Sequence, residues 1–226
     1  MSESSRKGRQ FRVSCLVAGT LFAVYMALGV LAVWSANRTR RQAERFLRDF
    51  VSLQVGKSTL EDVRRLAKDH DGTESVVSPE LAPAGCAPDC RISSFWFESQ
   101  WLYRLGLGPA TAMVATLQTG GGRLIGRAIA IESTSEWDSA VAVDERLLSR
   151  SGEPYNVRFR SMRPRWCVEF TPAAPAELRR RAFALNLDCL SRIPGCKTKE
   201  QILPEIQWEP APAKKQEAPR DPDVRP

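Results

Sequence analysis

VSCLVAGTLFAVYMALGVLAVW, residues 13–34, is a run of 22 residues without a charged side chain and is rich in leucine, valine and alanine. A helix rises about 1.5 Å per residue, so the run spans roughly 33 Å, which matches the hydrocarbon core of a bilayer. The apolar region of a cleaved signal peptide is shorter, about 7–15 residues. We therefore predict an uncleaved transmembrane helix over residues 13–34; the alternative is a signal peptide cleaved near Ser35 and Ala36.

Basic residues flank this run on both sides. Residues 1–12 hold four basic groups and one acidic group, and five arginines follow between Arg38 and Arg48. A count of flanking charges therefore does not separate the two sides. A short basic tail is a poor candidate for translocation, whereas a long C-terminal domain crosses largely regardless of its charge. We expect a cytoplasmic tail at 1–12 and an extracytoplasmic domain at 37–208, in the cell envelope.

Small residues recur within the apolar run at a spacing of four. Gly19, Ala23 and Ala27 share one face of the predicted helix, where a second helix can approach closely. This pattern predicts a helix–helix contact and, through it, a homodimer. A helix that faces lipid without a partner is the alternative interpretation.

Helical patterns follow the apolar run directly. Phe46, Leu47 and Phe50 recur at helical spacing, so the span is expected to continue as an amphipathic helix over residues 37–50. Ser58 and Glu61 have the spacing of a capping box, which predicts a second helix at about 59–69. Residues 71–89 are rich in proline, glycine, serine and alanine and indicate a loop.

Strand patterns dominate the next part of the chain. Residues 92–98 and 101–105 are aromatic-rich, and residues 111–118 and 124–131 flank three glycines at a predicted hairpin turn. A second strand pair is expected at 155–160 and 166–170, and a third helix at 175–190. Because helices come first, strands next and a helix last, we predict an α+β domain with helices packed on an antiparallel sheet. Residues 209–226 contain five prolines and are expected to be disordered.

One segment resembles a known family. The order is a helix, then Leu53-Gln54-Val55-Gly56-Lys57-Ser58-Thr59, a helix with Val63 and Leu66, Trp101-Leu102-Tyr103, and a hairpin that ends Gly122-Arg123-Leu124. Over about 50–135 this order is similar to the BamE/SmpA family of small envelope proteins. The resemblance implies two helices on a three-stranded antiparallel sheet that serve as a protein-interaction module in outer-membrane assembly. Family members are lipoproteins, whereas this chain has a helical span.

Cysteines outside the apolar run indicate disulfides, because the inferred compartment is oxidising. Cys189 and Cys196 flank the turn Ile193-Pro194-Gly195, so we predict that they are bonded to each other. Cys86 and Cys90 either bridge each other or send one partner to Cys167. A zinc site is the rival interpretation, but these spacings do not form two close pairs.

Motifs for other chemistry are weak. Gly56-Lys57-Ser58-Thr59 is similar to the end of a phosphate-binding loop, but Val51 occupies the position of the first glycine, so an N-cap turn is expected and no cofactor. His70 is the only histidine, and it is expected at the exposed end of the second helix beside two aspartates. Five tryptophans are expected mainly in the core: Trp96, Trp101, Trp137, Trp166 and Trp208.

Charge and composition limit the function classes. Residues 37–226 hold 29 basic and 25 acidic groups, too small an excess for a dedicated nucleic-acid binder. We therefore predict a non-enzymatic, membrane-anchored module that binds an envelope or membrane protein. The alternative is an envelope hydrolase acting on wall polymer, with no catalytic residues assigned. A glycosidase needs an acid–base pair of carboxylates, but nothing in the sequence singles out Glu98, Glu132, Glu136 or Asp138 for that role.

Overall fold

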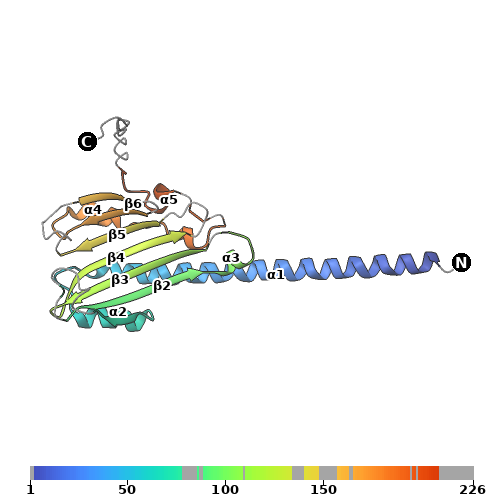
Figure 1. Ribbon diagram of the computed structural model, residues 1–226, viewed down its shortest axis with the longest axis horizontal. Coiled ribbons are helices and arrows are strands. Elements are labelled where there is room, and N and C mark those ends of the chain that lie inside the picture. Colours follow the sequence, from blue (N-terminus) through green and yellow to red (C-terminus); the bar gives the residue numbers. More distant parts are fainter. Residues whose placement is uncertain are drawn as a thin grey trace, which may run out of the picture.

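A single helix of 50 residues connects the apolar N-terminal segment to the folded domain (Figure 1). The computed structural model describes residues 3–77, 86, 89–108, 110–133, 140–147, 157–162, 165–193, 195–196 and 198–208, with side chains except at 3–14, 133, 157–162 and 165. In chain order these residues form α1 (Glu3–Ser52), α2 (Leu60–Asp69), β1 (Thr73–Val76), β2 (Arg91–Ser99), α3 (Trp101–Arg104), β3 (Thr111–Gly120), β4 (Arg123–Ser133), β5 (Ala140–Arg146), β6 (Val157–Met162), β7 (Arg165–Phe170), α4 (Ala176–Ala182), the 3-10 turn η1 (Leu187–Leu190) and α5 (Lys199–Ile202).

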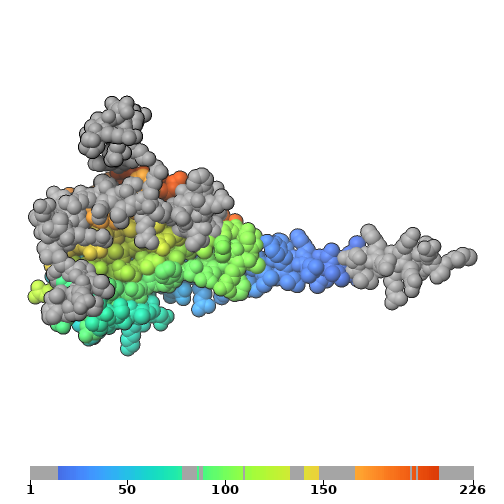
Figure 2. Space-filling view, viewed as in Figure 1, coloured from blue at the N-terminus to red at the C-terminus, as the bar shows by residue number. Residues whose placement is uncertain are grey.

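The two halves of α1 have different surroundings. Its N-terminal part protrudes from the domain as a rod (Figures 1 and 2). Its C-terminal part crosses the sheet on the face away from the viewer (Figure 1). Among the described residues α1 is the one helix that is long and apolar enough to cross a membrane, by length and composition. The expected amphipathic continuation is confirmed, because Ala43, Phe46 and Phe50 are completely buried. The centre of the Phe46 ring lies 4.6 Å from the centre of the Phe95 ring of β2.

The domain is α+β, as predicted, but its sheet is mixed and not purely antiparallel. Seven strands pair in the order β1-β2-β3-β4-β5-β7-β6, and β5 runs parallel to β7. A parallel neighbour needs a connection of a dozen or more residues. The chain from 147 to 164, which includes β6, supplies that length and brings β7 back between β5 and β6.

The hairpin between β3 and β4 is confirmed. Gly121 and Gly122 form its two-residue turn with φ values of 58° and 74°. Positive φ at both central residues gives the backbone twist that suits a tight hairpin, and glycine adopts it without steric cost. The second predicted pair is also present as β6 and β7.

The predicted second helix is present with a different cap. Thr59, and not Ser58, is the N-cap of α2: its side chain accepts a hydrogen bond from Asp62 N, and its backbone N–H donates to the Asp62 carboxylate. Ser58 is unsuited to this role because its hydroxyl accepts a hydrogen bond from Gln54 N in the preceding turn. The segment after α2 is not wholly a loop, since β1 pairs with residues 91–94 of β2.

The aromatic-rich segment at 101–105 includes the short helix α3, which packs on α1 through Leu102. One further expectation is wrong. The predicted helix at 175–190 is broken between α4 and η1 by residues 183–186. Of the tryptophans, Trp96 and Trp101 are 61% and 50% exposed, whereas Trp166 and Trp208 pack against the core. Trp137 and the proline-rich tail lie outside the described residues.

Candidate functional site

A groove lies between the last turns of α1 within the domain and the connection from α4 to η1. It encloses about 600 Å³. Both walls supply apolar side chains, and charged side chains accompany them on both walls. The lining residues are Glu44, Leu47, Arg48 and Val51 of α1 with Leu185, Asn186, Leu187 and Asp188 of the connection.

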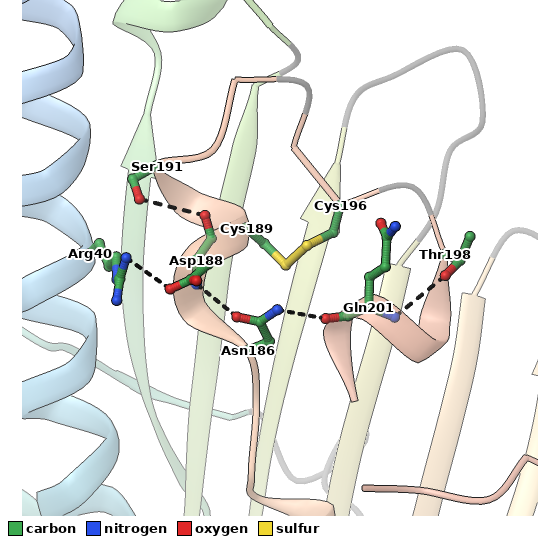
Figure 3. The surroundings of a disulfide bond; sticks show 8 residues. All are labelled: Arg40, Asn186, Asp188, Cys189, Ser191, Cys196, Thr198 and Gln201. Atoms are coloured by element: carbon green, nitrogen blue, oxygen red, sulfur yellow. Dashed lines mark hydrogen bonds and ion pairs between the residues drawn. A yellow bond between two sulfur atoms is a disulfide. The ribbon is translucent and has the colours of Figure 1, made fainter. Parts of the chain in front are cut away.

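Asn186 shapes the wall opposite α1. Its side-chain oxygen accepts a hydrogen bond from Asp188 N at 3.1 Å, and its Nδ2 donates to Gln201 O at 2.9 Å (Figure 3). Its backbone N–H donates to Ile202 O at 2.8 Å. These bonds replace those of a continuous helix, because an asparagine side chain competes with the backbone for local partners. This is why the predicted third helix ends early and leaves a groove beside α1.

A disulfide and an ion pair hold the same wall in place. Cys189 and Cys196, the pair that the sequence predicts, are joined in the structure with their Cα atoms 5.0 Å apart, and the bond ties η1 to the segment that leads into α5 (Figure 3). On the other side, Arg40 Nη1 of α1 lies 2.8 Å from Asp188 Oδ1. The Arg40 and Asp188 side chains are 35% and 56% exposed, so the pair adds little stability. It joins α1 to η1 beside the groove.

Arg127 of β4 fixes the end of α1 at the groove. Its Nη1 donates to the carbonyl oxygens of Phe50, Val51 and Leu53 at 2.9, 3.2 and 2.7 Å. The Phe50 and Val51 carbonyls belong to the last turn of α1, where the negative end of the helix dipole lies, and Leu53 directly follows the helix. Its Nε donates to Glu145 of β5 at 2.5 Å, with both side chains buried.

Burial and neighbouring groups act in opposite directions on the pKa of Arg127. Desolvation lowers the pKa of Arg127, while the adjacent Glu145 carboxylate raises it. The guanidinium lies 4.3 Å from the centre of the Phe183 ring and 5.6 Å from that of Phe50. A buried cation that meets a carboxylate, a helix end and two aromatic faces holds α1 firmly on the sheet.

The lining of the groove combines apolar and charged side chains. Leucine and valine side chains are accompanied by Glu44, Arg48 and Asp188, and this described lining contains no histidine, cysteine or hydroxyl side chain. Protein interfaces likewise combine apolar and polar side chains.

His70 lies in a separate hollow of about 290 Å³ between α1, the end of α2 and β2. It is the C-cap residue of α2, as expected, but its side chain is only 13% exposed. Its ring meets the Phe46 ring edge-on, and its Nε2 lies 2.8 Å from Asp49 Oδ2. Through these two contacts His70 links the end of α2 to α1. The described lining of this hollow contains no serine, threonine or cysteine.

The remaining cysteines and the small residues are placed as follows. Cys86 and Cys90 are bonded to each other, and neither disulfide includes Cys167, which lies on β7. Gly19, Ala23 and Ala27 are all exposed on the protruding part of α1.

Of the carboxylates considered for an acid–base pair, Glu98 and Glu132 are described by the structure and do not line the groove. Glu98 and Glu132 flank Ala112 in one row of the sheet. Glu98 accepts hydrogen bonds from the side chains of Trp96 and Gln100. Glu136 and Asp138 lie outside the described residues. Within the part of the chain that the structure describes, no three His, Cys, Asp or Glu residues are placed to hold a metal ion.

Sequence reasoning missed the groove and its two organising residues. Asn186 followed by Asp188 is a cap-like signal inside the predicted third helix, and it indicates a break at that point. Arg127 gives no such signal, because its partners are 18 to 77 positions away in the chain. Comparisons with protein-family models, with curated proteins and with solved structures found no match to this chain.

Proposed function

We propose that the protein is a single-pass, membrane-anchored envelope protein whose extracytoplasmic domain binds another protein in the groove beside α1. The observation that carries this proposal is the groove itself: its lining combines leucine and valine with charged side chains, and α1, one of its walls, continues into the apolar segment. A partner bound there is held next to the membrane on a rigid support.

The anchor rests on the exposure of the apolar half of α1. Leu16, Leu21 and Val30 are 72%, 65% and 67% exposed. Exposed apolar side chains around a helix of this length favour lipid as the surroundings. The two disulfides favour an oxidising compartment for the domain, which agrees with a cytoplasmic N-terminal tail.

The resemblance to BamE/SmpA proteins supports the binding role. The chain places α1, α2 and the antiparallel strands β2, β3 and β4 in the order that the resemblance implies. Backbone hydrogen bonds join the turn before α2 to the hairpin, from Gly56 N to Leu124 O and from Leu60 N to Gly122 O. In this chain four further strands and the α4–α5 segment enlarge that unit, and the enlargement supplies the second wall of the groove.

A photo-crosslinking amino acid at Val51 tests the proposal in intact cells. Val51 lines the groove and is 40% exposed, whereas the control position, Val76 on β1, is 71% exposed and does not line it. We expect a discrete protein adduct from Val51 and none of the same mass from Val76. A reporter fused after Trp208 that is active only outside the cytoplasm tests the orientation. Equal adducts from both positions, or a reporter active only in the cytoplasm, would overturn the proposal.

A further inference from the structure

The segment 101–108, with the sequence WLYRLGLG, lies against the protruding part of α1 (Figure 1). Leu102 packs with Ala32 and Ala36 in a small apolar cluster separate from the main core. Leu105 and Leu107 are half-buried against the same cluster. This segment therefore leaves the sheet and follows α1 back toward the N-terminus.

Two contacts show how far it reaches. The Tyr25 hydroxyl donates a hydrogen bond to Leu105 O at 3.3 Å. Leu107 Cδ1 lies 4.0 Å from the point that a Cβ atom would occupy at Gly29. Trp34 is the last residue of the apolar run. With a rise of about 1.5 Å per residue, Tyr25 lies roughly 13 Å nearer the N-terminus than Trp34. The segment thus runs alongside the second half of the apolar run.

The length of the apolar run requires that the part of α1 in contact with segment 101–108 lies within the hydrocarbon core. A hydrocarbon core about 30 Å thick needs about 20 helical residues. Residues 13–24, which precede the contact with Leu105, cover only about 18 Å of it. The rest of the hydrocarbon core must therefore be crossed by the part of α1 that segment 101–108 contacts. Moving the bilayer toward the N-terminus would instead draw Arg12 and Arg9 into the hydrocarbon.

The backbone of this segment suits a water-poor environment. Leu105 N donates to Trp101 O, Gly106 N to Tyr103 O and Leu107 N to Leu102 O. The last two bonds form a Schellman motif, for which Gly106 supplies the required positive φ of 67°. Since an unpaired backbone group is costly in lipid, these internal bonds and the Tyr25 hydroxyl lower that cost.

Aromatic side chains face outward from the same segment. Trp101 and Tyr103 are 50% and 58% exposed, and Trp34 on α1 is 62% exposed. Tryptophan and tyrosine are the residues that gather at the interface of a bilayer. Arg104 is exposed and stacks over the Trp101 ring at 5.9 Å, so its charge can extend toward the headgroups.

We propose that segment 101–108 is a second membrane-contact element, which enters the leaflet next to the domain beside α1 and holds the domain against the bilayer. The bilayer, rather than a partner helix, is the occupant, because the surface is continuous with the apolar run and lies at its level. This inference rests on the membrane anchor proposed above.

The test places p-benzoylphenylalanine at one position at a time in the full chain, reconstituted in phosphatidylcholine–phosphatidylglycerol vesicles. Tyr103 is the test position, Leu21 on the protruding helix is the lipid-facing reference and Val76 is the reference outside the bilayer. We expect lipid adducts from Tyr103 at a level similar to Leu21 and at least about tenfold above Val76, since a residue outside the bilayer meets no acyl chains. Adducts are identified by mass spectrometry.

The reference positions separate two kinds of failure. Lipid adducts from Leu21 with none from Tyr103 overturn the second contact and leave the anchor standing. A Tyr103 adduct with a second protein chain in place of lipid also overturns it and assigns the surface to a protein partner. Absence of lipid adducts from Leu21 itself overturns the anchor and this inference together.

Discussion

Replacing Arg127 by methionine tests what holds the C-terminal part of α1 on the sheet. The variant keeps an unbranched apolar stem of similar reach but removes every hydrogen bond of the guanidinium. It leaves the Glu145 carboxylate, 1% exposed, without its nearest cation, and it leaves three carbonyl oxygens at the end of α1 without their donor. We expect a large loss of stability with little change in the folded backbone.

The magnitude follows from the burial of the pair. Removing one member of a buried ion pair costs about 3–5 kcal/mol, because the other charge stays buried without compensation. Arg179 Nη1 remains 3.7 Å from Glu145 and reduces the cost. We therefore expect a loss of about 3 kcal/mol in the free energy of unfolding. Adding Glu145→Leu to the variant should recover part of this loss, since it removes the uncompensated charge.

Equilibrium unfolding in urea, followed by tryptophan fluorescence of the full-length protein in detergent, measures this loss. With an m-value of about 1–3 kcal/mol per molar urea, the midpoint should fall by at least about 1 M. Arg180→Met is the matched control, because Arg180 pairs with Glu177 and Glu205 on the surface. If Arg127→Met shifts the midpoint no further than Arg180→Met, the role assigned to Arg127 is wrong.

Three further variants test other parts of the structure. Hydrogen bonds from Thr59 hold the pKa of Asp62 below its ordinary value of 3.8, so this contact stabilises α2 above pH 3.8 and is lost as the pH falls through the lowered pKa. Asp62→Asn should therefore remove this part of the acid dependence of helicity. An NMR titration that gives Asp62 a pKa at or above 3.8 would contradict this account. Replacing both Cys189 and Cys196 by alanine should cost about 2–3 kcal/mol in the chain-entropy model, whereas equal urea midpoints for variant and wild type would refute the bond. His70→Ala should leave the Val51 adduct unchanged, because His70 lines the other hollow; loss of that adduct at normal abundance would point to His70 as part of the site.

Local sequence patterns were enough to predict the elements whose stability is local. The apolar run, the burial of Phe46 and Phe50 and the two-glycine hairpin each follow from a spacing of residues within one element. The third helix was predicted too long because Leu185 fits the apolar stripe. The local conformation is decided instead by the bonds of Asn186, from its side-chain amide to Gln201 O and from its backbone N–H to Ile202 O.

Local sequence patterns did not predict the contacts between segments that are distant in the chain. Segment 101–105 was expected only to be aromatic-rich, and its helical form depends on Ala32 and Ala36 of α1, about 70 positions away in the chain. The parallel pairing of β5 with β7 depends likewise on how a long connection packs. The groove likewise depends on a contact between distant segments, because one wall is α1 and the other is residues 185–188. Only the cysteine pair beside it was predicted from the sequence.

The groove is the centre of the proposed function, and two arginines of α1 allow a matched test of it. Arg48 lines the groove, whereas Arg45, also exposed and three residues away, lines the hollow of His70. The measurement is the yield of the Val51 photo-adduct in cells that produce Arg48→Glu or Arg45→Glu at the abundance of the wild type. We expect Arg48→Glu to abolish the adduct and Arg45→Glu to leave it intact. An adduct that survives Arg48→Glu, or that both variants abolish equally, would contradict binding in the groove.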